Sequence, residues 1–209
     1  VKAECAGASG TTLSDEKPFT ISQENVEITY TGDTLVFTAG PTISTAPVHL
    51  SAHLDQEVDG HPGDLTLAKV TFALFKSSNL GSTPDLTFDA AVIASGDALT
   101  TATLSTDVWT VKVTIKQGNG YWQGAEALAV LTVSPGSASQ SVTGGGWIPD
   151  SNSANGKGNF GFTVNYQKNA APKGSFVYAF RGKDGYDYVV KSNSWQGGGL
   201  SFTGTNKAY

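Results

Sequence analysis

Apolar and polar residues alternate along most of the chain. The segments with this pattern are 26–30, 48–54, 70–74, 88–92 and 109–115, and apolar residues also gather in two further short segments, 35–37 and 128–133. Side chains of successive residues in a β-strand point to opposite faces of the sheet, so a period of two predicts strands that bury one face. No 12-residue window repeats apolar residues at the three- and four-residue spacing of an amphipathic helix. The pattern therefore predicts an all-β protein.

Glycine, proline and aspartate separate the predicted strands and divide the chain into three parts. Residues 21–135 hold most of the strands, and their spacing is typical of an Ig-like antiparallel β-sandwich. The small-residue linker "SPGSASQS" (134–141) marks the boundary to a second, smaller β module in 136–209. Residues 1–20 are small and polar, which predicts a flexible leader.

The second module is short for an independent domain. Alternation returns at 160–166, 176–180 and 186–190, and more briefly at 200–202. So few strands in about seventy residues bury little surface. We therefore expect this module to be incomplete or to pack on the sandwich.

Composition narrows the range of partners and locations. The net charge is −5 and the 13 Lys and Arg residues are scattered singly, which argues against a nucleic-acid partner. No stretch approaches the roughly 20 apolar residues of a membrane helix, so we expect no membrane span. Few charges with much Gly, Ser and Thr are typical of secreted β-proteins. The chain has no methionine, so we expect it to belong to a longer protein. The single cysteine, Cys5, excludes an internal disulfide and leaves a free thiol or an outside partner as alternatives.

Residues 156–161, "GKGNFG", match the G-x-G-x-x-G pattern of dinucleotide-binding proteins. That pattern binds phosphate when a strand precedes the glycines and a helix follows them. Here a loop, 149–155, precedes them and an alternating strand, 160–164, follows them. We therefore interpret the glycines as residues that permit tight turns and positive φ.

The acidic loop 55–64 is the strongest candidate metal site. It carries Asp55, Glu57, Asp59 and Asp64 together with two glycines. Carboxylates at alternate positions can converge on Ca²⁺, which prefers six to eight oxygen ligands. An EF-hand would need Glu at its twelfth position, where this loop has Thr66. The alternative is a plain turn, in which Asp and Gly are common.

Motifs for catalysis are absent from the sequence. It contains no G-x-S-x-G and no H-E-x-x-H, and Cys5 has no nearby histidine. His49 and His53 lie about 13 Å apart if they share a strand, too far for one zinc ion. Asp184 and Asp187 beside two tyrosines are typical of a polar strand edge. We expect no enzyme activity.

Aromatic residues beside glycine are candidates for sugar stacking. Trp147 and Trp195 are the preferred pair, since a flat ring in a loop can stack on the face of a sugar. Their alternative role, and the preferred one for Tyr121 and Trp122, is to cap an end of a sandwich and exclude water. Trp109 lies within an alternating strand and is expected in the core.

Two segments resemble known families of secreted proteins. Residues 30–133 resemble a bacterial Ig-like repeat in "YTGDTL" (30–35), "VDGHPGDLTLAKVTFAL" (58–74), "WTVKVTI" (109–115) and "GNGYWQGAEALAVLTV" (118–133). Residues 142–205 resemble the post-COAP-1 type of module in "TGGGWI" (143–148), "GKGNFGFTVNYQK" (156–168) and "GSFVYAF" (174–180). The family module usually runs further than this segment. Neither family supplies catalytic residues.

These resemblances imply a non-catalytic structural or adhesive module of a larger extracellular or cell-surface protein, as part of an extracellular assembly. The expected partners are other domains of the same polypeptide, or neighbouring copies bound by strand addition at an open sheet edge. The alternative function is a carbohydrate-binding accessory module of a secreted hydrolase, with polysaccharide as the partner. Calcium is the only cofactor that the residues suggest.

Overall fold

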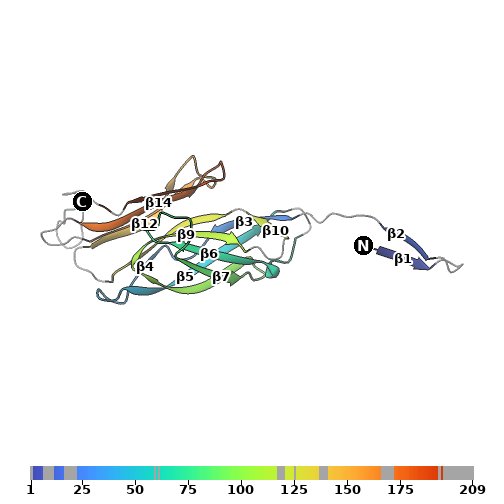
Figure 1. The fold of residues 1–209 in the computed structure, drawn as a ribbon, viewed down its shortest axis with the longest axis horizontal. Coiled ribbons are helices and arrows are strands. Elements are labelled where there is room, and N and C mark those ends of the chain that lie inside the picture. The colour runs from blue at the N-terminus through green and yellow to red at the C-terminus, as the bar shows by residue number, and fades with distance from the viewer. Residues whose placement is uncertain are drawn as a thin grey trace.

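The structure of the chain is a computed structural model. It describes residues 2–6, 12–16, 23–58, 60, 62–116, 121–124, 126–136, 141–165, 172–192 and 194, with the backbone alone for the first two ranges. β1 (Lys2–Ala6) and β2 (Thr12–Glu16) pair antiparallel. Figure 1 shows this hairpin at one end of the molecule, away from the other strands. It lies in the segment expected to be a flexible leader, whose sequence pattern does not predict it.

Residues 24–134 form a β-sandwich of two sheets. The first sheet has the order β10-β3-β5-β8, and its strands are β3 (Glu24–Tyr30), β5 (Thr45–Gln56), β8 (Asp97–Ser105) and β10 (Trp122–Gly124). The second sheet has the order β4-β11-β9-β6-β7, and its strands are β4 (Leu35–Phe37), β6 (Lys69–Phe75), β7 (Leu86–Ala91), β9 (Asp107–Ile115) and β11 (Ala127–Ser134). One 3₁₀ turn, η1 (Leu65–Leu67), precedes β6. The prediction of an all-β sandwich is confirmed.

Most strand pairs are antiparallel, but two short pairs are parallel. β3 pairs with β10 and β4 pairs with β11, so the first strands of the sandwich lie beside its last strands. These two parallel pairs were not predicted, because alternation within a strand carries no information on its distant neighbours.

The alternating residues meet between the two sheets. In β5 buried and exposed residues alternate from Thr45 onward, as the sequence pattern predicts. The largest fully buried side chains here are Trp109, Phe72, Leu50, Leu54, Leu74, Leu104 and Leu131. Trp109 is 1% exposed, which confirms its predicted place in the core.

A third sheet packs on the outer face of the sandwich. Its strands, in sequence order, are β12 (Ser141–Pro149), β13 (Lys157–Asn165), β14 (Lys173–Arg181) and β15 (Asp187–Ser192), all antiparallel. β13 and β14 contact β9 and β11, and Figure 1 shows the resulting layers. A second apolar cluster lies between them and consists of Val108, Leu128, Val130, Val177 and Ala179. The second module therefore packs on the sandwich, one of the two arrangements that its length predicts.

The glycines of residues 156–161 have two different roles. Gly156 has φ of +73° in the turn before β13, as predicted for a tight turn. Gly161 lies inside β13 and faces the sandwich, where a Cβ would come within 2.5 Å of Thr132 Oγ1 and 2.8 Å of Val130. Gly161 is therefore needed because the two sheets approach closely at this position, and its own φ is not positive. The predicted strand at 160–164 is confirmed as part of β13.

Candidate functional site

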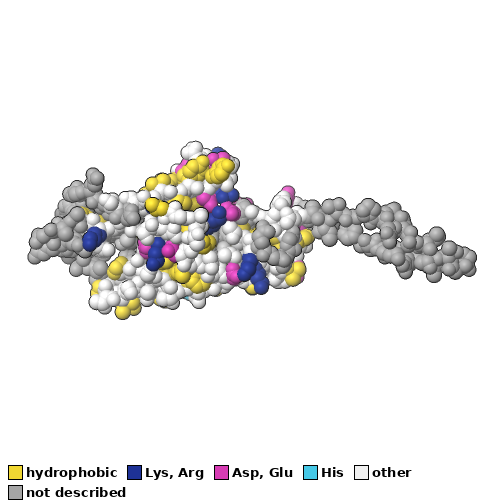
Figure 2. Space-filling view, in the orientation of Figure 1, with side chains coloured by type: hydrophobic (Ala, Val, Ile, Leu, Met, Phe, Trp, Pro, Cys, Tyr) yellow, Lys and Arg dark blue, Asp and Glu magenta, His cyan; other side chains and the backbone are white. Residues whose placement is uncertain are grey.

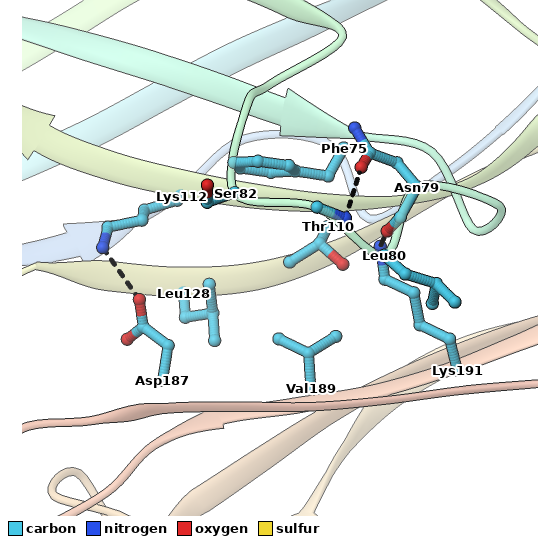
Figure 3. Close-up of a pocket in the computed structure, with 11 residues that line it drawn as sticks. Phe75, Asn79, Leu80, Ser82, Thr110, Lys112, Leu128, Asp187, Val189 and Lys191 are labelled. Carbon is cyan, nitrogen blue, oxygen red and sulfur yellow. Dashed lines mark hydrogen bonds and ion pairs between the residues drawn. The ribbon is translucent and has the colours of Figure 1, made fainter.

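A cleft of mixed polar and apolar character lies at the seam, which we define as the contact zone between the sandwich and the third sheet. Its volume is about 390 Å³, and it is bounded by the loop after β6, by β9 and by β15. Leu80, Leu128 and Val189 form apolar walls, and Lys112 and Asp187 close one end (Figure 3). β15 reaches this cleft because its alternate residues, 187, 189 and 191, face the sandwich.

Four charged side chains at that end form one network. Lys112 Nζ lies 2.7 Å from Glu126 Oε2 and 2.8 Å from Asp187 Oδ2. Arg181 Nη1 lies 2.6 Å from the same Glu126 oxygen and 2.8 Å from Asp187 Oδ1. Two positive and two negative charges therefore cancel, and each side chain is less than a third exposed. In Figure 2 acidic and basic side chains lie together at the junction of the two modules.

The pKa values of the network follow from this geometry. Burial raises the pKa of Asp187, but hydrogen bonds from Lys112 and Arg181 outweigh it and bring the pKa below its usual range. Burial lowers the pKa of Lys112, but hydrogen bonds to Asp187 and Glu126 outweigh it and raise the pKa. Asp187, Lys112 and Arg181 are therefore held in their charged forms, which suits a joint between two layers rather than a proton-transfer site.

The other end of the cleft is formed by Lys191. Its Nζ donates hydrogen bonds to the backbone oxygens of Lys76 (2.8 Å) and Asn79 (2.7 Å). Burial lowers its pKa. The buried Thr110 hydroxyl lies on the floor of the cleft and has no hydrogen-bond partner in the described part of the chain. Lys191 thus ties β15 to the loop after β6, so both ends of the cleft fasten the third sheet to the sandwich.

The acidic loop is organised by separate contacts. Asp64 accepts hydrogen bonds from Thr66 N (3.0 Å) and Thr66 Oγ1 (2.6 Å) and caps η1. Glu57 accepts from Asn25 Nδ2 (3.1 Å), and Asp55 lies 3.3 Å from His53 Nε2. Gln56 closes the loop by bonding both backbone groups of Gly63.

A calcium site in this loop stays a prediction. Within the described residues, no three His, Cys, Asp or Glu side chains are placed to hold a metal ion. Asp59, the fourth residue of the predicted set, lies outside the described residues. To bind Ca²⁺, the carboxylates of Asp55, Glu57 and Asp64 would have to leave their present hydrogen-bond and ion-pair partners.

The two histidines of β5 both lie beside carboxylates, and they share none. His53 Nδ1 lies 2.7 Å from Asp97, and this hydrogen bond raises the pKa of His53. His49 Nδ1 lies 3.3 Å from Asp33. Both residues lie on the same strand, as the sequence predicts, and each pair ties β5 to a neighbouring segment.

The predicted sugar-stacking residues are only partly described. Trp147 lies on β12 and is 54% exposed, with Lys157 Nζ 4.5 Å from the centre of its ring. Trp195 lies outside the described residues. Trp122 is buried and packs edge-on against Tyr121, whose hydroxyl donates to Glu24 Oε2 (2.7 Å). Trp122 belongs to the apolar core of the sandwich and Tyr121 packs against that core.

Sequence reasoning missed the charged network. Asp187 was expected at a polar strand edge, and this expectation is wrong because its side chain faces the sandwich and bonds Lys112 and Arg181. β15 has apolar residues on both faces, so alternation alone cannot show which face turns inward. The sequence signal that could have indicated the network is the set of charged residues 181, 187 and 191, which fall on one face of the neighbouring strands β14 and β15.

The described part of the chain contains no helix of the length and hydrophobicity that crossing a membrane requires. No protein-family model matches the chain, and comparison with curated proteins finds no match either. The resemblances to a bacterial Ig-like repeat and to a post-COAP-1 type of module therefore stay predictions.

Proposed function

We infer that the chain is a non-catalytic structural and adhesive module of a larger extracellular or cell-surface protein, and that it carries tension along its length. The observation that supports this function is the parallel pairing of the first strands of the sandwich with its last strands. We call the two pairs, β3–β10 and β4–β11, the clamp.

Side-chain and backbone hydrogen bonds reinforce the clamp. Thr132 N donates to Thr34 O and Thr38 N donates to Ser134 O, both at 2.9 Å. The buried Thr38 hydroxyl accepts from Gly136 N (2.9 Å) and donates to Gly40 O (2.7 Å). Gln123 Nε2 donates to Asn25 Oδ1 (2.8 Å) in the other pair.

The direction of the strands determines how the clamp responds to a pull. Paired parallel strands run the same way, so pulling the start of β4 and the end of β11 apart slides one strand along the other. All hydrogen bonds of the pair then bear the load together. In an antiparallel hairpin pulled at its two ends, the bonds would open one after another. The clamp therefore resists force better than its short length suggests.

Force spectroscopy on the full chain, held by its two ends, tests this proposal. We expect the third sheet to detach first and the sandwich to resist to a higher force. Unfolding of residues 23–136 should release roughly 400 Å of chain, which identifies that event. Thr38→Val keeps the shape of the side chain, removes both hydroxyl bonds and should lower the sandwich force, because forced unfolding reports the unfolding barrier.

Thr71→Val is the matched control. Thr71 lies on β6, outside the clamp, and its hydroxyl donates to Asp89 on β7 (2.7 Å). Equal force for the two variants, or a sandwich that opens below the force of the third sheet, would contradict the load-bearing function.

A second function, that of a carbohydrate-binding accessory module, is favoured by one observation. Trp147 presents more than half of its surface to solvent on β12. Lys157 Nζ lies over the ring, and the solvent-exposed part of the ring is the surface on which a sugar would stack. Loss of polysaccharide binding in Trp147→Ala would support this alternative.

A further inference from the structure

Two turns lie together at one end of the third sheet. The first, residues 150–156, joins β12 to β13, and the second, residues 182–186, joins β14 to β15. The backbone links them directly, since Ala154 N donates to Arg181 O (2.8 Å) and Lys183 N donates to Asn152 O (3.0 Å). Ser153 and Gly182 form a β-bridge, and Ser153 is fully buried. The two turns therefore form one fixed unit rather than two independent loops.

A groove of about 390 Å³ lies against these turns. Phe180 and Tyr188, on β14 and β15, are directly opposite each other and stack with their centres 4.9 Å apart and their planes 11° apart. Tyr188 is 43% exposed. In Figure 2 hydrophobic side chains gather on the outer surface of this sheet. The groove thus has a flat aromatic side that is open to solvent.

The position of Tyr188 is fixed by its surroundings. Its hydroxyl donates to Asp184 Oδ2 (2.6 Å), and Asp184 Oδ1 accepts from Tyr186 N (3.2 Å). A Cβ on Gly182 would come within 2.4 Å of Asp184 Oδ1 and 2.7 Å of the Tyr188 ring. Glycine at this position therefore makes room for the ring and its carboxylate partner, so the groove is formed before any ligand arrives.

Polar groups surround the aromatic side. Ser151, Asn152, Lys183 and Asp184 all line the groove. In the described part of the chain, the side chains of Ser151 and Lys183 form no hydrogen bond. Lys183 and Asp184 contribute one charge of each sign, so the groove has no net charge. It offers donors and acceptors at its rim without attraction for a polyanion.

We propose that this groove binds a neutral glycan, with one pyranose ring against Tyr188 and its hydroxyl groups bonded to Asn152, Lys183 and Asp184. A pyranose has an apolar face of C–H groups and a polar rim, which match an aromatic surface edged by polar side chains. The ligand is neutral because the groove is neutral. This site is separate from Trp147 and stands whether or not the clamp carries tension.

Calorimetric titration of the full chain tests the site. The probes are cellohexaose, maltohexaose and chitohexaose, with polygalacturonate as the anionic comparison. At least one neutral hexaose should bind with Kd of about 1 mM or tighter. Tyr188→Ala should weaken that binding roughly tenfold, since the stacking surface is lost. The double variant Asn152→Ala/Lys183→Ala removes two polar side chains at the rim. It should weaken hexaose binding about threefold without altering the melting temperature.

Tyr186→Ala is the matched control, because Tyr186 is 70% exposed on the same turn and does not line the groove. It should leave the affinity unchanged. The proposal is overturned if no neutral hexaose binds, if only polygalacturonate binds, or if Tyr186→Ala and Tyr188→Ala have equal effects. A loss confined to Trp147→Ala would also overturn it and would favour the Trp147 surface.

Discussion

At the scale of single residues, glycine shows how one residue type serves different purposes within six positions. Gly156 supplies a positive φ in a turn, and Gly161 lets two sheets approach each other. Composition and spacing predict the turn, because Gly is common where φ is positive. They do not predict the close approach, because Val130 and Thr132 lie on a strand of the other module.

Gly161→Ala should therefore destabilise the protein. The added methyl group meets Thr132 and Val130, which are short, branched side chains that have little freedom to move aside. We expect a loss of about 1–3 kcal/mol in the free energy of unfolding, measured by denaturant titration. Gly40→Ala is the control, since nothing lies within 4 Å of its Cβ position. Equal stability of the two variants would show that the sheets separate to accommodate the methyl group.

At the scale of elements, β11 is covered by neighbours on both of its faces along its whole length. All eight residues, Ala127–Ser134, are buried. Leu131 and Val133 face the core of the sandwich, while Leu128 and Val130 face the third sheet. The sequence predicts this strand, and its nearly continuous apolar run is typical of a strand buried on both sides. It does not identify the element that covers the outer face.

Polar substitutions should thus destabilise β11 on either face. Val130→Thr and Val133→Thr keep the shape of the side chain and bury a hydroxyl without a ready partner, so each should lower the free energy of unfolding by about 1–3 kcal/mol. Val190→Thr, at a 57% exposed position of β15, is the matched control and should change little. Thermal melts compare the three. A harmless Val130→Thr would mean that the third sheet does not protect β11 from water.

At the scale of the whole molecule, three sheets stack as layers, and the charged network of Lys112, Glu126, Arg181 and Asp187 fastens one edge of the seam. Alternation predicts the strands, and the small-residue linker at 134–141 predicts a boundary between two modules. The stacking order and the parallel pairs escape prediction, because they depend on contacts between residues about a hundred positions apart. Less of the candidate sites can be predicted from the sequence. The positions of Asp187 and of the groove at Tyr188 depend on which face of β15 turns toward the sandwich, and alternation does not determine this.

The network should make stability depend on pH. The pKa of Asp187 is lower in the folded chain than the unfolded value of about 3.9, so its contribution is present above that pH and is lost as the pH falls through the folded pKa. The melting temperature of Asp187→Asn should lie below that of the wild type at pH 7, and the gap should close as the pH falls below about 4. Val189→Ala, a neutral change on the same face, should show a constant gap. A constant gap for Asp187→Asn would contradict this role.

The parallel pairing of β3 with β10 and of β4 with β11 also has a consequence for synthesis on the ribosome. Glu24 pairs with Trp122, and Leu35 pairs with Thr132, so β3 and β4 each pair with a strand that is translated much later. Contacts this distant in sequence make folding slow. Until β10 and β11 have been made, β4 and the edge of β3 that faces away from β5 have no strand partner in the nascent chain, which favours a sequence rich in hydroxyl groups and glycine over one that would associate prematurely.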